Sequence, residues 1–186
     1  MNGYLLHQFL ATGTNGRRDA YGGSVAGRVR FIVETATAAA IGADRVGIRV
    51  SPANPFNDMN EDDPTATYAA LLEALAPLGL AYVSCSSPAG SRFSALDLAR
   101  EHWPGTLIVN SGAELPWRPE AAAAIVAAGR ADLISFARHA LANPDLVERI
   151  RRGARLNAPD PATYYGGDHR GYTDYPTLDD RLEDVA

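Results

Sequence analysis

Four short apolar runs, each followed by a stretch that favours helix, constrain the fold of this chain more than any other feature. The runs are Arg45–Val50, Leu80–Cys85, Thr106–Asn110 and Asp132–Phe136. Strands that alternate with helices indicate a parallel sheet whose crossover connections are right-handed. The chain is therefore predicted to be an α/β protein.

Helix start signals support the same alternation. Asp63 precedes Pro64, which is typical of an N-cap and a first turn, and we expect that helix to run to about Leu78. The segment from Ser94 to Asp97 carries a capping signature. Further helices are predicted over Arg28–Ile41 and Pro119–Ala128, and from Asn143-Pro144 onward.

The spacing of the units, roughly 25 to 35 residues each, fits half of a closed (β/α)₈ barrel. An open doubly wound sheet is the alternative, but no G-x-G-x-x-G sequence follows a predicted strand. We therefore expect one partial TIM-barrel domain over residues 1–186. Residues 1–155 would carry the helices and βα units, and residues 156–186 would form an irregular tail rich in Pro, Gly, Asp and Tyr.

Composition excludes several classes of partner. The chain has 186 residues, of which 46% are hydrophobic and 21% are charged, and its net charge is -5. This balance is typical of a globular domain and argues against a nucleic-acid surface. No run approaches the roughly 18 apolar residues of a membrane span, so we expect no membrane partner. The single cysteine, Cys85, indicates a reducing compartment, and the cytoplasm is the predicted location.

Other candidate sites are not supported by the sequence. The four histidines have no metal-ligand spacing, and Cys85 has no second cysteine to pair with, so we predict no metal site. Glu61-Asp62-Asp63 is interpreted as a solvated loop and a helix start rather than as paired catalytic carboxylates. Ser84 to Ser87 lack the G-x-S-x-G sequence that surrounds a nucleophilic serine.

Two of the predicted strands lead into turns that suit a phosphate group. Ser111-Gly112 follows Thr106–Asn110, and it is small enough for backbone N–H groups to approach an anion. Ala137-Arg138 follows Asp132–Phe136 and adds a guanidinium fork. Phosphate sites after the last two strands are frequent in (β/α)₈ barrels, so we predict a phosphorylated cofactor.

Several longer segments, taken together, resemble the Old Yellow Enzyme family of FMN-dependent ene-reductases. They match the family in order and in spacing over essentially the whole chain. The segments are Asn2–Leu10, Asn15–Ser24, Arg28–Phe31, Gly47–Pro52, Phe56–Met59, Phe136–Arg138, Leu141–Leu146, Tyr165 and Gly171–Pro176.

The resemblance implies a fold and an activity. In that family the Asn-Gly-Tyr segment follows the fourth barrel strand, so the chain would supply strands five to eight, the carboxyl-terminal half of the barrel. The family's activity would be reduction of the C=C bond of small α,β-unsaturated carbonyl compounds. Non-covalently bound FMN would deliver the hydride after its own reduction by NADH or NADPH.

The resemblance also implies roles for individual residues. Tyr4 would be the general acid that protonates the substrate, since a phenol keeps its proton at neutral pH. Asn2 would donate to the substrate carbonyl, and Tyr165 would line the substrate pocket. The cofactor-binding residues would be Arg49 at the flavin ring, with Ser111, Gly112, Ala137 and Arg138 at its phosphate.

Each of these residues also has a structural alternative. Tyr4 and Tyr165 would be packing aromatics, Asn2 a turn residue, and Arg49 a buried arginine paired with a carboxylate. The corresponding alternative for the whole chain is a half-barrel without catalysis, either a truncated gene product or a phosphate-binding or assembly module.

A half-barrel also implies a partner. Its two edge strands, Arg45–Val50 and Asp132–Phe136, would leave backbone groups unpaired. We expect the inner face to be rich in Val, Ile and Leu, and the chain to pair with itself or with an amino-terminal half-barrel.

Overall fold

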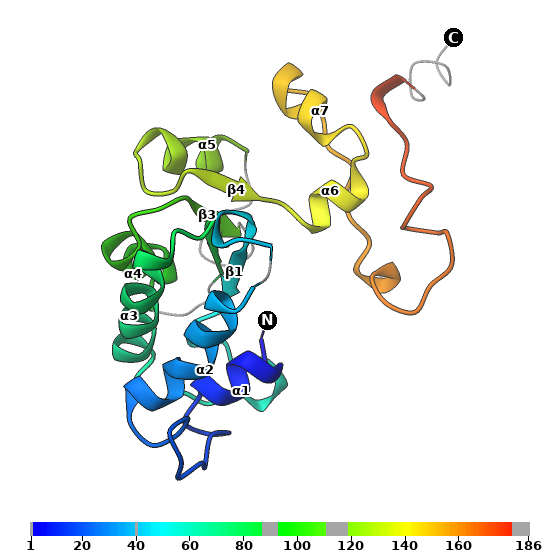
Figure 1. The fold of residues 1–186 in the computed structure, drawn as a ribbon. Helices are drawn as coiled ribbons and strands as arrows, with labels where there is room; N and C mark the ends of the chain where they lie inside the picture. The colour runs from blue at the N-terminus through cyan, green and yellow to red at the C-terminus, as the bar shows by residue number, and fades with distance from the viewer. Residues whose placement is uncertain (1, 40, 87–92, 111–118, 180–186) are drawn as a thin grey trace. The chain divides into compact units, whose positions relative to one another are not determined.

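The computed structural model describes residues 2–39, 41–86, 93–110 and 119–179, which belong to two compact units (Figure 1). Unit 1 is Met1–Ser135 and unit 2 is Phe136–Ala186. The α-helices are α1 Leu5–Leu10, α2 Val25–Thr37, α3 Pro64–Leu75, α4 Ala95–His102, α5 Pro119–Ala127, α6 Arg138–Ala142 and α7 Leu146–Arg152. The strands are β1 Gly47–Val50, β2 Tyr82–Cys85, β3 Leu107–Asn110 and β4 Leu133–Ser135, and short 3₁₀ helices lie at Ala43–Arg45, Phe56–Asp58, Ala76–Leu78 and Pro161–Thr163.

The four strands form one parallel sheet in the order β1-β2-β3-β4, as the alternation of strands and helices predicts. Each strand therefore lies beside the strand that precedes it in the sequence. A doubly wound sheet has a point at which this order reverses, whereas a barrel does not. The sheet order thus favours the predicted partial barrel.

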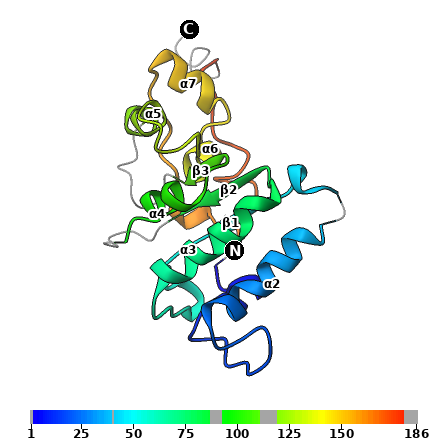
Figure 2. The ribbon, with the colours of Figure 1, turned by 60° about the vertical axis from the view of Figure 1, so that its left-hand side comes forward.

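One face of the sheet is buried against helices. The register aligns Ile48 with Val83 and Val83 with Leu107, and the next buried row contains Val50, Cys85 and Val109. Helices α2, α3 and α4 lie next to one another along this face (Figures 1 and 2).

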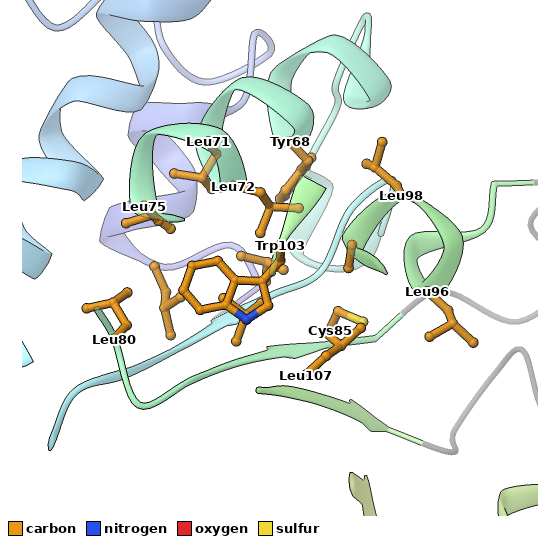
Figure 3. Close-up of a cluster of buried hydrophobic side chains, with 14 of the residues drawn as sticks. Tyr68, Leu71, Leu72, Leu75, Leu80, Cys85, Leu96, Leu98, Trp103 and Leu107 are labelled. Carbon is orange, nitrogen blue, oxygen red and sulfur yellow. The ribbon is translucent and has the colours of Figure 1, made fainter. Parts of the chain in front are cut away.

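Trp103 lies at the centre of this core and is 2% exposed (Figure 3). Its indole Nε1–H donates to the carbonyl of Thr106, 3.0 Å away, so the ring is buried without an unsatisfied donor. The α3 side chains around it are Tyr68, Leu71, Leu72 and Leu75. This cluster holds the helical layer to the sheet.

The opposite face of the sheet is open in unit 1. It carries the alternate residues of each strand, which are Gly47, Arg49, Tyr82, Ser84, Ile108, Asn110, Leu133 and Ser135. The predicted apolar inner face is therefore wrong in part, because the valines of the three longer strands point toward the helices. β1 and β4 are the edges of the sheet, as predicted.

Two capping predictions are confirmed and other helix boundaries differ. The carboxylate of Asp63 accepts from Ala66 N–H, and Ser94 Oγ accepts from Asp97 N–H. Helix α2 begins at Val25 rather than at Arg28, because Ser24 Oγ accepts from Gly27 N–H and starts the helix earlier. Helices α1 and α6 lie in segments that the sequence did not indicate as helical.

Unit 2 is organised around a buried arginine. Arg149 is 0% exposed, and its guanidinium donates to Asp145 Oδ1 at 2.5 Å and to the carbonyls of Arg155 and Pro176 at 2.7 Å each. Helix α7 begins at Leu146 rather than at the predicted Asn143-Pro144. The Asn143 side chain instead contacts Asn157, whose backbone N–H donates to Asn143 Oδ1 at 2.7 Å. The irregular tail is thus fixed to α6 and α7.

Candidate functional site

Polar side chains gather at the carboxyl ends of the strands in unit 1. Ser51 and Ser86 directly follow β1 and β2, and their hydroxyl oxygens are 3.4 Å apart. Asn110 ends β3, and its Nδ2 donates to Ser135 Oγ, at the end of β4, over 3.1 Å. Active sites of (β/α)₈ barrels lie at this end of the sheet. A functional site is therefore expected at the carboxyl ends of the strands.

The Asn2-Gly3-Tyr4 turn is bound to the loop that follows β1. Asn2 Nδ2 donates to the carbonyl of Phe56 over 2.6 Å, and Asn57 Nδ2 donates back to the carbonyl of Asn2 over 2.8 Å. Two of the segments that carried the family resemblance are thus joined reciprocally, although they are more than fifty residues apart in the chain.

This junction explains why position 3 is a glycine. Gly3 has a φ of 75°, a left-handed conformation that glycine adopts without a steric cost. A Cβ atom at this position would overlap the side chain of Asn57. The facing loop is itself unusual, because Ala53, Asn57 and Asp58 all have positive φ values. Such strained residues persist only where the surrounding contacts hold them, and they cluster at functional sites.

Tyr4 is exposed on this turn, at 70% of its accessible surface. It is therefore not the packing aromatic that was its structural alternative. Asn2 is partly buried, and its Oδ1 atom is buried without a hydrogen-bond partner among the described residues. One N–H of its amide is used by Phe56, which leaves the second N–H for a ligand.

Arg49 lies on the open face of β1 and is exposed. No hydrogen bond or ion pair joins its guanidinium to another residue in the described part of the chain. Its structural alternative, a buried arginine paired with a carboxylate, is therefore not what the structure shows. A positive charge without a partner suits an anionic or electron-rich ligand.

A buried polar network lies beneath the turn, and the sequence did not reveal it. His7 is 1% exposed; its Nδ1 accepts from Gly3 N–H over 3.1 Å, and its Nε2 is 3.2 Å from Glu61 Oε1. Glu61 Oε2 accepts from Ala53 N–H over 2.7 Å. The prediction that Glu61 is a solvated loop residue is therefore wrong, since its side chain is only 5% exposed.

Tyr68 completes this network from helix α3. Its hydroxyl oxygen lies 3.3 Å from His7 Nε2, the atom that also faces Glu61 Oε1. Burial, together with the negative charge of Glu61, raises the pKa of Tyr68 well above its ordinary value. Tyr68 therefore stays protonated within this network.

The predicted phosphate anchor lies in unit 2. Arg138 is the first residue of α6, and its guanidinium lies over the ring of Tyr164, 5.7 Å from the ring centroid. Burial, together with the neighbouring Arg138 cation, lowers the pKa of His139 to about 4. At neutral pH the positive charge here therefore comes from Arg138 and not from His139.

Of the remaining predicted site residues, two are exposed and two are not described by the structure. Ala137 is exposed and stands at the N-cap position of α6. Tyr165 is 93% exposed and borders an open hollow of about 570 Å³ with Asp168 and Gly171. It is not buried in the tail, as its structural alternative required. Ser111 and Gly112 lie outside the described residues.

The described residues form neither a metal-ligand cluster nor a membrane-spanning helix. No three His, Cys, Asp or Glu side chains in that part of the chain are grouped as metal ligands. None of its helices combines the length and the hydropathy that crossing a membrane requires.

Comparison with known sequences identifies relatives of this chain. It is 44% identical over 183 residues to a probable flavin mononucleotide-dependent alkene reductase of Leishmania infantum, an alignment that covers 95% of this chain and 48% of the relative. It is 42% identical to a putative 12-oxophytodienoate reductase of Oryza sativa subsp. japonica, with 98% of this chain and 48% of the relative covered. The chain thus spans about half the length of these relatives.

Solved structures are also similar to this chain. Morphinone reductase superposes with a TM-score of 0.87 at 41% identity, over 97% of this chain and 49% of the other. The old yellow enzyme from Trypanosoma cruzi superposes with a TM-score of 0.88 at 33% identity, over 95% and 48%. These neighbours are (β/α)₈ barrels, so the predicted fold of a partial barrel is confirmed.

A sequence profile of one family matches residues 1–157, which is most of the chain. The match includes the turn at Tyr4, the loop after β1, and Arg49 and Arg138. The chain belongs to the NADH:flavin oxidoreductase / NADH oxidase family.

Proposed function

We propose that this chain supplies strands five to eight of an FMN-dependent barrel that reduces the C=C bond of α,β-unsaturated carbonyl compounds. Residues 1–186 would form one partial barrel domain. The carrying observation is the exposed Tyr4 phenol, held on a turn that is bound to the loop after β1. The printed names of the relatives, an alkene reductase and an oxophytodienoate reductase, support the same class of substrate.

The residues present fit an FMN group. Arg49 and Arg138 both expose guanidinium groups that have no ion-pair partner among the described residues. Such groups suit the electron-rich ring edge and the phosphate of a flavin nucleotide. Ala137, which precedes Arg138, is small and exposed. When bound, FMN supplies hydride transfer, with NADH or NADPH as its reductant.

The chain's own residues then have distinct tasks. The O–H group of Tyr4 holds the proton that the substrate carbon receives, which is the work of a general acid. The second N–H of the Asn2 amide donates to the substrate carbonyl and draws electron density from the alkene. Arg49 places a fixed positive charge on the same unit of the molecule. Tyr165, exposed in unit 2, would line the substrate pocket.

A second candidate is a half-barrel without catalysis, which serves as a phosphate-binding or assembly module. The open face of the sheet favours it, because Leu133 is 53% exposed and Tyr82 is 39% exposed. Strands β1 and β4 also leave their outer backbone groups unpaired in the described sheet. Pairing with a second copy or with an amino-terminal half-barrel would cover these surfaces.

Flavin titration tests the proposal. Arg138→Ala should weaken FMN binding by roughly 2–4 kcal/mol, because a charge-assisted phosphate contact is lost, and should leave binding of phosphate-free riboflavin unchanged. Arg152→Ala, which removes another exposed arginine of unit 2, is the control and should alter neither affinity.

Two outcomes would count against these assignments. Equal losses for FMN and riboflavin would exclude Arg138 as the phosphate anchor. A protein that binds FMN without reducing any enone would favour the second candidate.

A further inference from the structure

In the buried network beneath the Asn2-Gly3-Tyr4 turn, the hydrogen bonds define which atoms donate and which accept. Gly3 N–H can only donate, so His7 Nδ1 must be an unprotonated acceptor. The proton of the neutral imidazole is therefore on Nε2, which faces the Glu61 carboxylate at 3.2 Å. The tautomer of His7 is thus set from one side by a backbone amide and from the other by a buried acid.

Glu61 is held in place in the same way. One carboxylate oxygen receives the imidazole N–H of His7 and the other receives the backbone N–H of Ala53. Ala53 is one of the residues with positive φ in the loop after β1. A buried carboxylate with a donor at each oxygen is satisfied without a cationic partner. It can therefore act as a fixed acceptor that orients His7.

The network ends at the residue before Tyr4. Gly3 is bound on both sides from helix α1, because its N–H donates to His7 and its carbonyl accepts from Gln8 Nε2 over 2.8 Å. The phenol of Tyr4 itself remains exposed. The backbone that carries the phenol is therefore fixed while its side chain is free to meet a substrate.

From this geometry we propose that His7 is a positioning residue for Tyr4, acting through the Gly3 N–H and oriented by Glu61. The inference depends on the proposed function, since it assigns His7 to the reaction in which Tyr4 is the proton donor. A group that holds a reacting side chain indirectly affects the rate through misplacement, and displacements of about 1 Å cost up to about 100-fold.

Two substitutions separate the halves of the imidazole. His7→Asn keeps an amide oxygen near the position of Nδ1, so it retains the acceptor for Gly3 N–H and loses the donor to Glu61. His7→Gln keeps an amide N–H near the position of Nε2, so it retains the donor to Glu61 and loses the acceptor for Gly3. His102→Gln is the matched control, because His102 contacts a carboxylate, Glu73, on the outer surface of the helices.

The first measurement is amide hydrogen exchange at Gly3 by NMR, which needs no cofactor. Gly3 should exchange roughly 10-fold or more faster in His7→Gln than in the wild type, because its hydrogen bond is lost. His7→Asn and His102→Gln should match the wild type. Unchanged Gly3 exchange in His7→Gln would overturn the proposal.

The second measurement follows alkene reduction and flavin reduction separately in the flavin-loaded protein. His7→Gln should slow alkene reduction roughly 10–100-fold without slowing flavin reduction, and His7→Asn should restore most of the rate. In the Tyr4→Phe background, His7→Gln should add little further loss, because both act on one step.

The outcomes distinguish this proposal from the function on which it depends. Equal rate losses in His7→Asn and His7→Gln, or an additive loss in the double variant, would show that His7 supports the fold only and overturn its positioning role. A wild-type protein with a protected Gly3 amide and bound FMN but no alkene reduction would instead overturn the proposed function.

Discussion

The polar groups at the two ends of the parallel sheet differ in whether they have partners within the chain. At the amino end, Asp132 Oδ2 accepts from Leu107 N–H over 2.8 Å and lies 3.2 Å from Arg100 Nη1. The other guanidinium nitrogen of Arg100 donates to the carbonyls of Trp103 and Gly105. The polar groups that gather here are bound to one another and to the backbone.

At the carboxyl end, several polar groups have no hydrogen-bond or ion-pair partner among the described residues. Arg49 has no hydrogen bond or ion pair within the described residues, and Tyr4 is exposed on the turn bound to the following loop. The buried Oδ1 of Asn2 has no hydrogen-bond partner among those residues. Stability is therefore concentrated at one end of the strands and binding capacity at the other, as in (β/α)₈ enzymes generally.

The largest expected effect concerns the carboxyl end. Tyr4→Phe should slow alkene reduction by roughly 10²–10⁴-fold, because it removes the proposed general acid, and should leave flavin reduction by the nicotinamide nearly unchanged. Stopped-flow measurement of the two half-reactions checks this. Tyr21→Phe is the control, since that phenol bonds Glu34 on helix α2 and should affect neither rate. If Tyr4→Phe slows both half-reactions alike, the residue is structural.

The next effect concerns the core at the amino end. Trp103→Ala should destabilise the protein by about 3–5 kcal/mol, because it opens a large cavity between α3, α4 and the sheet. Urea denaturation would measure the loss, and Trp103→Phe should cost less because it fills most of the space. The comparison predicts that folded Trp103→Phe binds FMN as the wild type does. A clear loss of FMN affinity in that variant would contradict the separation of the two ends.

The smallest effect tests the charge at the amino end. Hydrogen bonding from Leu107 N–H, with help from Arg100, lowers the pKa of Asp132. A lowered pKa in the folded state means that the carboxylate stabilises the protein above its unfolded-state pKa, and that this contribution is lost as the pH falls through the folded-state value. Asp132→Asn should cost only roughly 0.5–1 kcal/mol at pH 7, since the side chain is 50% exposed.

Thermal or urea unfolding of both proteins across pH 2–7 should show this difference shrinking toward acid. A difference for Asp132→Asn that is constant with pH would mean that its carboxylate charge contributes nothing.

Local signals were sufficient for most of the fold. The predicted strands contain the observed ones, since each apolar run was bounded by polar or turn residues. The caps at Asp63 and Ser94 were correct because they depend on contacts within four residues. The start of α2 was predicted three residues too late, at Arg28, although the cap from Ser24 Oγ to Gly27 N–H is an equally local contact.

The contacts of the site depend on distant partners and could not be predicted in the same way. Glu61 was assigned to solvent because two further acids follow it, and only its contacts with His7 and Ala53 account for its burial. The family resemblance indicated Asn2, Tyr4 and Arg49, but not why Gly3 is required. That reason, the close approach of Asn57, exists only in the folded chain.

The order of the strands also determines when each part of the protein can form during synthesis. Each strand pairs only with its neighbours in sequence, so the sheet can grow one unit at a time as the chain emerges, and such local contacts favour rapid folding. The turn at Tyr4 depends on more distant contacts. The hydrogen bond from Asn2 to the carbonyl of Phe56 spans 54 residues, and the buried His7 contacts Glu61 and Tyr68, which are synthesised later. The turn that carries Tyr4 therefore reaches its final position only after the loop that follows β1 and helix α3 have been made, so the exposed phenol is fixed in place later than the strand it adjoins.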